Sequence, residues 1–290
     1  MQSSGRTLSE VLDLGRTYLD ASGVGEARLK CELLLSRLLG VPRLALHMHR
    51  ERVLRDPELA AMRRALKRLR RGEPVQYVIG ETGFMDHVFK TDGRALVPRP
   101  ETEVLVQRML QDPSLWEHEK PLIADVGTGS GCIVLSLAAA RPDGRYLAID
   151  ISEDALALAQ ENAARLQLDD HVIFYAGDLE DVVEAEMLDA IVANLPYIPS
   201  AEIETLERSV RDFEPRLALD GGASGLDIIT DLIADAGIVL KSGGKIFLEI
   251  GCEQGRAVRS LLDENGFVQI EVLPDLHGRD RVVCGVLGYS

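Results

Sequence analysis

The sequence predicts an α/β protein: a doubly wound, mostly parallel sheet of seven strands with an antiparallel last strand, preceded by a small helical domain. Apolar runs of strand length end at Val126, Ile151, Tyr175, Ala193, Ile250, Val272 and Leu287. Helical stretches lie between most of them, at 131–140, 153–167, 226–240 and 253–265, which is typical of a parallel sheet covered on both faces. The last two strands, near 266–273 and 281–287, are joined too briefly for a helical crossover, so we expect them to pair antiparallel.

The first 72 residues have the pattern of a helical domain. In TLSEVLDLGRTYLDASG, Thr7 stands three residues before Glu10, the spacing of a capping box. Apolar residues follow at helical spacing, and EARLKCELLLSRLLG and DPELAAMRRALKRLRRG continue the pattern, each ended by glycine. Alternation and turn signals in GFMDHVFKTDGRALVPRP then predict a β-hairpin linker at 73–98. The sheet would occupy 99–290.

Composition excludes several classes of protein. The chain has 290 residues, of which 46% are hydrophobic and 27% charged, ordinary values for a soluble globular protein. No apolar run reaches the roughly 18 residues of a membrane span, and the N-terminus lacks the apolar core of a signal peptide. The cysteines fit no metal-ligand spacing; they are Cys31, Cys132, Cys252 and Cys284. We therefore expect a reduced, cytoplasmic protein that holds no metal.

Charge is unevenly distributed along the chain. Residues 1–80 carry 15 Lys and Arg against 9 Asp and Glu, whereas the remainder carries 17 against 38, so the balances are +6 and −21. An acidic body is poorly suited to a nucleic-acid backbone, which needs a positive track. It suits a basic protein partner, or it only confers solubility. The basic run RRALKRLRR is interpreted as a solvated helix face, with an RNA or ribosomal contact as the alternative.

A glycine-rich turn in LIADVGTGSGCIVLSLAAA predicts a cofactor site. Gly127, Gly129 and Gly131 allow a tight turn, close approach of a ligand and free N–H groups at the following helix. Asp150 ends the next strand about 20 residues later, where an acid binds ribose hydroxyls. In the GDL segment, Asp178 is placed to accept from an adenine amino group. The alternatives are a glycine turn that only packs helix on strand and an Asp178 that only forms a turn.

The strand DAIVA runs into Asn194, Leu195, Pro196 and Tyr197. Taken alone, these residues could be a strand-ending turn, since Asn and Pro are common there. After a cofactor turn, they more strongly indicate the place where a substrate meets the cofactor.

Together these motifs resemble the S-adenosylmethionine-dependent methyltransferases, and one family in particular, the peptide chain release factor glutamine methyltransferases of the HemK type. Beyond the turn and the two acids, the matching segments are LVPRPETEVLV (96–106), NLPYIP (194–199), EPRLALDGGASGLD (214–227), LEIGCEQ (248–254) and GRDRVV (278–283). The resemblance implies a class I, Rossmann-like methyltransferase sheet behind a helical domain that docks the substrate. The methyl acceptor would be the glutamine of the Gly-Gly-Gln loop in translation release factors.

The resemblance also implies the site residues. S-adenosyl-L-methionine would be bound by Gly127, Thr128, Gly129, Ser130, Gly131, Asp150, Ile151, Asp178, Leu179 and Asn194. The substrate would be bound by Asn194, Leu195, Pro196 and Tyr197 with Arg99 and Glu101, and the first four would be catalytic. For the PRPETE segment, the alternative is that Pro100 and Glu101 only start a helix.

The chemistry of the acceptor explains these residue types. A carboxamide nitrogen is a weak nucleophile because its lone pair is delocalised, whereas a sulfonium methyl is already activated. We expect the Asn194 side-chain oxygen and the Leu195 carbonyl to accept the two N–H bonds while Tyr197 stacks on the amide. The nitrogen would then be held about 3–3.5 Å from the methyl group by fixed dipoles.

Leu195 departs from the family, in which this position is usually a second proline. NLPY resembles the ribosomal RNA adenine dimethyltransferases, so an adenine-amino methyltransferase acting on RNA or DNA is the alternative. A non-catalytic cofactor-binding module is a third possibility. The GTGSG turn, PRPETE, EPRLALDGG and the acidic body favour the protein substrate. Leucine retains the backbone carbonyl and loses only the fixed φ of proline.

Overall fold

The computed structural model describes residues 5–117 and 119–289, which divide into two compact units. One unit extends to Glu81 and also includes Glu207–Phe213. The other comprises Thr82–Leu206 and the chain from Glu214 onward. Within the described residues, no helix is long and apolar enough to cross a membrane.

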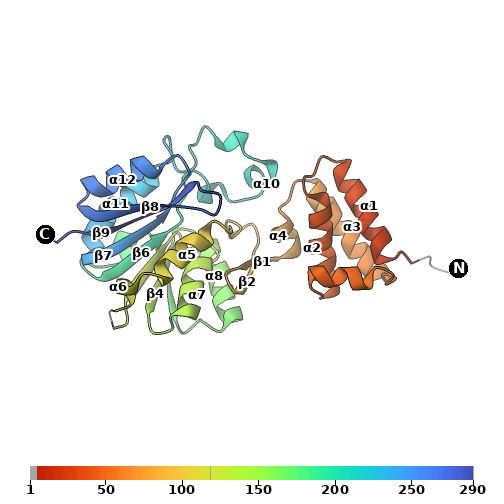
Figure 1. The fold of residues 1–290 in the computed structure, drawn as a ribbon, viewed down its shortest axis with the longest axis horizontal. Coiled ribbons are helices and arrows are strands. Elements are labelled where there is room, and N and C mark those ends of the chain that lie inside the picture. Colours follow the sequence, from red (N-terminus) through yellow and green to blue (C-terminus); the bar gives the residue numbers. More distant parts are fainter. Residues whose placement is uncertain (1–4, 118, 290) are drawn as a thin grey trace. The chain divides into compact units, whose positions relative to one another are not determined.

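The first unit is helical, as expected (Figure 1). Its elements are α1 (Leu8–Asp20), α2 (Ala27–Leu39), the 3₁₀ helix η1 (Arg43–His49), α3 (Asp56–Arg70), α4 (Val75–Ile79) and α10 (Arg208–Arg211). The capping box of α1 is present, because the Thr7 hydroxyl accepts from the Glu10 N–H and the Glu10 carboxylate accepts from the Thr7 N–H. The charged side chains of the basic run 63–71 are exposed, as a solvated helix face requires.

The hairpin is shorter than the predicted 73–98. Pairing is confined to β1 (Glu81–Phe84) and β2 (His87–Lys90), while Val75–Ile79 is helical. Pro74 precedes this helix, and Gly80 ends it with a φ of 82°. Proline before a first turn and glycine after a last turn are helix signals, and here they determine the local structure.

The second unit contains the predicted seven-stranded sheet. Its strands are β3 (Leu122–Val126), β4 (Arg145–Asp150), β5 (Val172–Ala176), β6 (Leu188–Ala193), β7 (Leu240–Glu249), β8 (Phe267–Pro274) and β9 (Asp280–Leu287), in the order β5-β4-β3-β6-β7-β9-β8. β9 is antiparallel to both β7 and β8, which confirms the antiparallel last strand. Predicted strand ends at Val126, Ala193 and Leu287 coincide with the observed ends.

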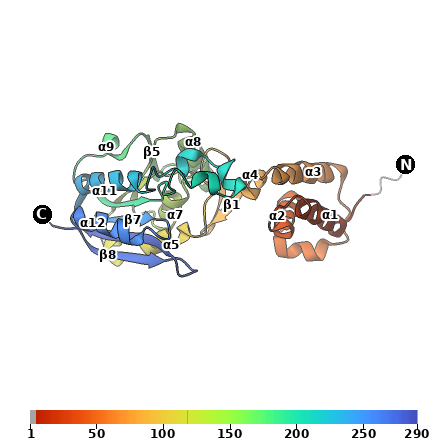
Figure 2. The same ribbon diagram turned by 90° about the horizontal axis from the view of Figure 1, so that it is seen from above.

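Helices cover both faces of this sheet (Figures 1 and 2). One face packs against α5 (Thr102–Leu110), α7 (Cys132–Ala140) and α8 (Glu153–Leu166). The other packs against α9 (Leu179–Val182), α11 (Asp227–Val239) and α12 (Gly255–Glu264). Short pieces complete the unit: α6 (Pro113–Trp116), η2 (Ile203–Thr205) and η3 (Arg216–Ala218).

The strand order places the site. β3 pairs with β4 on one side and with β6 on the other, so the order reverses between β3 and β6. In doubly wound sheets, a ligand binds beyond the carboxyl ends of the strands at this reversal. The glycine turn follows β3, and Asn194 follows β6.

Candidate active site

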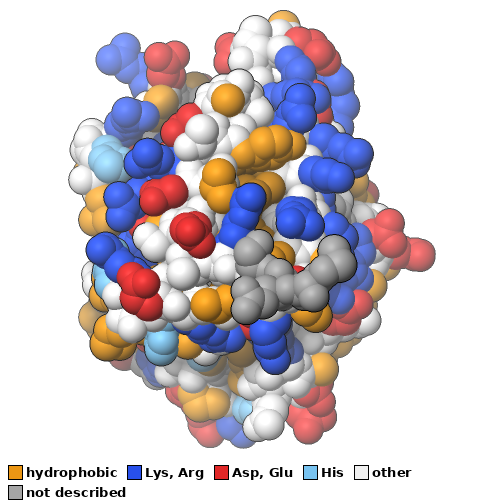
Figure 3. All heavy atoms as spheres, turned by 90° about the vertical axis from the view of Figure 1, so that its right-hand side faces the viewer, with side chains coloured by type: hydrophobic (Ala, Val, Ile, Leu, Met, Phe, Trp, Pro, Cys, Tyr) orange, Lys and Arg blue, Asp and Glu red, His pale blue; other side chains and the backbone are white. Residues whose placement is uncertain are grey.

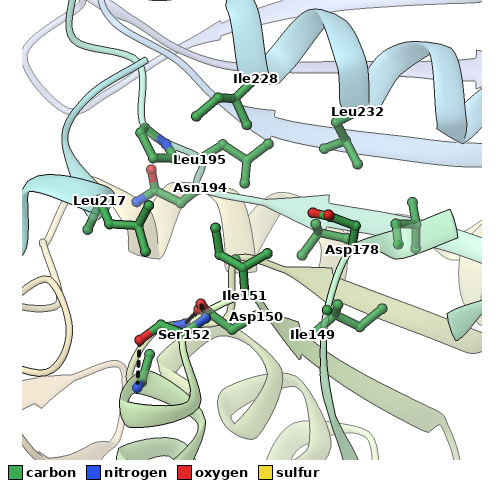
Figure 4. Close-up of a pocket in the computed structure, with 18 of the residues that line it drawn as sticks. Ile149, Asp150, Ile151, Ser152, Asp178, Asn194, Leu195, Leu217, Ile228 and Leu232 are labelled. Carbon is green, nitrogen blue, oxygen red and sulfur yellow. Dashed lines mark hydrogen bonds between the residues drawn. The ribbon is translucent and has the colours of Figure 1, made fainter. Parts of the chain in front are cut away.

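A cavity of about 590 Å³ opens at the carboxyl ends of β3, β4, β5 and β6 (Figure 4). A cavity of this size suits a small-molecule cofactor. The predicted residues that line it are Gly127, Gly129, Asp150, Ile151, Asp178, Leu179, Asn194, Leu195 and Pro196. The predicted residues that do not line it are Thr128, Ser130, Gly131, Tyr197, Arg99 and Glu101.

The glycine turn needs its glycines. Gly127, Gly129 and Gly131 have φ values of 70°, 57° and 78°, a region that favours glycine. The side chain of Thr128, between the first two glycines, faces the interior and donates its hydroxyl hydrogen to Asp125 Oδ2 at 2.7 Å. Thr128 and Ser130 are both buried. The turn therefore presents its backbone to the cavity, which explains why these two side chains do not line it.

Asp150 holds the turn against β4. Its Oδ2 accepts from the Gly129 N–H at 2.8 Å, and its Oδ1 accepts from the Ser152 N–H at 2.9 Å. The side chain is only 9% exposed, and burial raises its pKa while these two bonds oppose the rise. A carboxylate has about four lone-pair sites. Asp150 can therefore accept ligand hydroxyls in addition to its two backbone bonds.

Apolar side chains face one another across the cavity. Ile151 projects from the end of β4, and Ile228 and Leu232 project from α11 (Figure 4). They form a slot that suits a flat ring, with Asp178 at its side. Sequence reasoning missed the α11 residues, because an apolar helix face looks the same whether it covers a sheet or a ligand.

Asn194 lies at the cavity end of β6. Its Nδ2 donates to the Thr102 hydroxyl at 3.2 Å. Within residues 5–117 and 119–289, no protein donor pairs with its Oδ1 or with the Leu195 carbonyl. Both oxygens are therefore available as acceptors.

Tyr197 contacts two charged side chains. Its hydroxyl is 3.5 Å from Glu249 Oε1 and 3.5 Å from a guanidinium nitrogen of Arg281. Burial, followed by the neighbouring Glu249, raises the pKa of Tyr197 to about 12. The phenol is therefore a neutral group held by its two neighbours.

The segment 214–227 forms a wall of the cavity. Its backbone is tied to the motif by hydrogen bonds between Ile198 and both Leu219 and Gly221. A Cβ atom at Gly221 would lie 2.6 Å from the Pro196 carbonyl oxygen. Glycine is therefore required here for close approach of two backbones.

Arg99 and Glu101 stand apart from the cavity. The Arg99 guanidinium pairs with Glu214 at 2.5 Å, and Glu214 also accepts from the Val97 N–H at 3.1 Å. This buried carboxylate joins the PRPETE segment to the EPRLALDGG segment. Glu101 is the residue before α5 and makes no side-chain cap there. Arg99 is thus first of all a structural link, and the substrate-binding role of both residues stays a prediction.

Two buried carboxyl groups were not predicted. Asp125 is fully buried, and burial raises its pKa to about 7. Glu249 is 2% exposed, and burial raises its pKa to about 7, although Thr102 and Arg281 oppose the rise. Each has one oxygen without a hydrogen-bond partner among the described residues. Both occur in segments that carry the family resemblance, but only the fold brings Glu249 next to the motif.

Comparison with known proteins decides the family. The model of the PrmC N-terminal domain matches residues 10–80, and that of the methyltransferase small domain matches residues 100–222. The release factor glutamine methyltransferase of Geobacter sulfurreducens is 38% identical over 97% of this chain and 97% of its own length. That of Moorella thermoacetica is 43% identical over 95% of this chain and 96% of its own length. The chain belongs to the release factor glutamine methyltransferase family.

Membership makes the protein an S-adenosylmethionine-dependent methyltransferase. Among solved structures, the hMettl16 catalytic domain in complex with MAT2A 3'UTR hairpin 1 matches with a TM-score of 0.53 and 16% identity, covering 81% of this chain and 82% of that chain. At this identity the likeness shows the shared fold. The cavity fits the family's cofactor, since it combines a buried acid, a backbone turn and an apolar slot.

Proposed function

We propose that this protein transfers the methyl group of S-adenosylmethionine to the side-chain amide of the glutamine in the Gly-Gly-Gln loop of a translation release factor. The observation that carries the proposal is the pair of unpartnered acceptors at the end of β6, Asn194 Oδ1 and the Leu195 carbonyl, beside the cofactor cavity. The names of the relatives specify release factor glutamine.

In this proposal, each part of the cavity binds one part of the cofactor. Asp150 accepts the ribose hydroxyls, as acids at this strand position do. Asp178 accepts from the adenine amino group, with Ile151, Leu179 and Leu232 against the ring faces. The backbone of the turn from Gly127 to Gly131 faces the methionine part. The cofactor supplies a methyl group that is already activated by its sulfonium.

The motif residues act on the acceptor amide. Asn194 Oδ1 and the Leu195 carbonyl each accept one N–H of the glutamine, and so orient its nitrogen towards the methyl group. Pro196 stiffens the backbone that presents the carbonyl. Tyr197 stacks on the planar amide, with its hydroxyl held by Glu249 and Arg281. Fixed acceptors in a water-poor cavity lower the barrier without having to reorganise.

We assign docking of the release factor to the helical domain, residues 1–72, joined through the linker 73–98 to the methyltransferase domain, 99–290. The positive balance of this domain favours an acidic surface on the partner. Leu44 and Met48 of η1 are each 78% exposed. Figure 3 shows many Lys and Arg side chains, with hydrophobic side chains between them, on one face of the molecule. Exposed apolar side chains within a charged surface are typical of protein interfaces. We place the reaction in the cytoplasm, with no direct nucleic-acid binding.

A mass spectrum of a purified release factor, incubated with cofactor with and without this protein, tests the proposal. We expect one added methyl group on the peptide that contains the Gly-Gly-Gln glutamine. A parallel incubation with RNA and DNA tests the adenine alternative. Methylation of nucleic acid without methylation of the factor would refute the protein-glutamine assignment.

A further inference from the structure

Two buried side chains outside the predicted site contact the segment from Asn194 to Tyr197. Thr102 and Glu249 are each 2% exposed, at the start of α5 and the end of β7. We infer that Thr102 and Glu249 are positioning residues that hold the Asn194 carboxamide with its oxygen towards the acceptor nitrogen. This inference rests on the proposed function, because it concerns how the glutamine amide is oriented.

The orientation of Asn194 is chemically ambiguous without a partner. A carboxamide presents an acceptor at one end and two donors at the other. With its NH₂ towards the cavity, Asn194 would oppose the NH₂ of a glutamine, donor against donor. Only the orientation with Oδ1 towards the cavity provides the acceptor that methyl transfer needs.

Thr102 selects that orientation. Its Oγ1 lies 3.2 Å from Asn194 Nδ2 and accepts from it. A threonine hydroxyl has a single hydrogen to donate. If that hydrogen were given to Asn194, the amide could equally turn its oxygen towards Thr102. The hydroxyl therefore needs a second partner that accepts its hydrogen.

Glu249 is that partner. Its carboxyl group interacts with the Thr102 hydroxyl, and this interaction lowers the pKa of Glu249 against the larger rise that burial causes. In its charged form, this carboxyl group is an acceptor only, so it takes the hydroxyl hydrogen and leaves the Thr102 lone pairs for Asn194 Nδ2. Glu249 Oε1 also accepts from the Tyr197 hydroxyl at 3.5 Å. One buried acid thus supports both motif side chains.

A second charged side chain, that of Arg281, also contacts Tyr197. Arg281 donates to the Tyr197 hydroxyl at 3.5 Å and to the Ile250 carbonyl at 3.1 Å, and it pairs with Asp275 at 3.4 Å. Arg281 lies on β9, while Glu249 lies on the adjacent β7. Two paired strands of the sheet therefore both contact Tyr197.

Substitution of Thr102 separates positioning from packing. Thr102→Val keeps the shape but removes the acceptor, and Thr102→Ser restores it. Thr91→Val is the matched control, because Thr91 is also fully buried and its hydroxyl has no partner among the described residues. For each variant, kcat and KM for the release factor, the Kd for cofactor and the thermal midpoint are measured.

We expect Thr102→Val to lower kcat about 10- to 100-fold, because misplaced reacting groups cost that order of rate. The cofactor Kd and the KM for the release factor should stay within about twofold of wild type. Thr102→Ser should recover most of kcat, and Thr91→Val should match wild type. Wild-type kcat in folded Thr102→Val, or equal losses in Thr102→Val and Thr102→Ser, would overturn the inference.

Glu249→Gln tests the inference independently if Thr102→Val does not fold. Glutamine has nearly the same shape, but its NH₂ can donate to Thr102 and compete with Asn194. We expect kcat to fall about tenfold with unchanged cofactor affinity, and unchanged kcat would contradict the inference. Failure of the wild-type protein to methylate the factor would instead refute the proposed function, so the two failures are distinguishable.

Discussion

The side chain of Leu195 lies against Gly127, so that a Cβ atom built on the glycine would stand 2.9 Å from Leu195 Cδ2. Leu195 is 7% exposed and belongs to the apolar cluster between the sheet and α11. The residue that replaces the usual proline therefore packs the motif directly onto the first glycine of the cofactor turn. Its side chain has a structural task in addition to the proposed task of its carbonyl.

Leu195→Pro separates these two tasks. Proline keeps the carbonyl and fixes φ, but it removes buried apolar atoms over Gly127. We expect the free energy of unfolding to fall by about 1–3 kcal/mol. Turnover per folded molecule should be equal or modestly higher. Chemical denaturation and kcat at saturating substrates check both expectations; a large loss of kcat in folded protein would show that the leucine side chain itself takes part in catalysis.

Gly127→Ala should weaken cofactor binding at least tenfold. The substitution adds a Cβ atom against Leu195 and places alanine at a φ of 70°, a strain of about 1–3 kcal/mol. Addition of Leu195→Ala should relieve the contact but not the backbone strain, so calorimetric titration of the double variant should show partial recovery. Gly237→Ala, in open space within α11, is the control and should bind cofactor normally. Normal affinity of Gly127→Ala would exclude a close approach of ligand here.

Asp150→Ala should raise the Kd for cofactor by one to three orders of magnitude. The change removes an acceptor for ribose hydroxyls and both bonds that hold Gly129 and Ser152, each bond to a charged group contributing about 1.5–3 kcal/mol. Asp150→Asn retains one acceptor oxygen and should lose less. Calorimetric titration measures both variants, and an unchanged Kd in Asp150→Ala would remove Asp150 from the cofactor site.

Asp125 should make stability depend on pH. Burial raises the pKa of Asp125 from 3.8 to about 7, so between these values the folded state keeps a proton that the unfolded state has released. The wild type should therefore lose stability as pH rises from about 4 to 7, by a few kcal/mol at most for this group.

Asp125→Asn should remove this component, since an amide oxygen can still accept from Thr128 and the Val134 N–H. The difference in unfolding free energy between variant and wild type, measured without cofactor, should favour the variant increasingly up to about pH 7. A difference independent of pH would contradict the raised pKa. Because Glu249 is present in both proteins, it cancels in this comparison.

Features with a local signal were predictable from the sequence. The glycine turn, Asp150 and the end of β6 were all located, because turn residues after apolar runs report the strand ends directly. The antiparallel β9 followed from a connection that is too short for a crossover helix. The α4 helix was missed, because hairpin signals further along outweighed Pro74 and Gly80.

Features made by distant segments were not predictable. Thr102 and Glu249 are far apart in the sequence, and nothing in either segment reveals that they contact Asn194 and Tyr197, respectively. The pairing of Arg99 with Glu214 likewise joins two motifs that are distant in the sequence. The Thr128 and Ser130 side chains of the turn are buried while Gly127 and Gly129 line the cavity, which the letters GTGSG do not show. The spacing of residues in the sequence identified the type of chemistry. The packing of the fold decides which of their side chains line the cavity and which lie in the core.

The most direct test of the central claim compares wild type with Asn194→Ala on a purified release factor under single-turnover conditions with labelled cofactor. Asn265→Ala, an exposed asparagine after α12, serves as the control. Wild type and control should label the peptide with the Gly-Gly-Gln glutamine, whereas Asn194→Ala should bind the factor and cofactor but transfer methyl at least 100-fold more slowly. Full transfer by folded Asn194→Ala would contradict the claim that this amide holds the acceptor nitrogen.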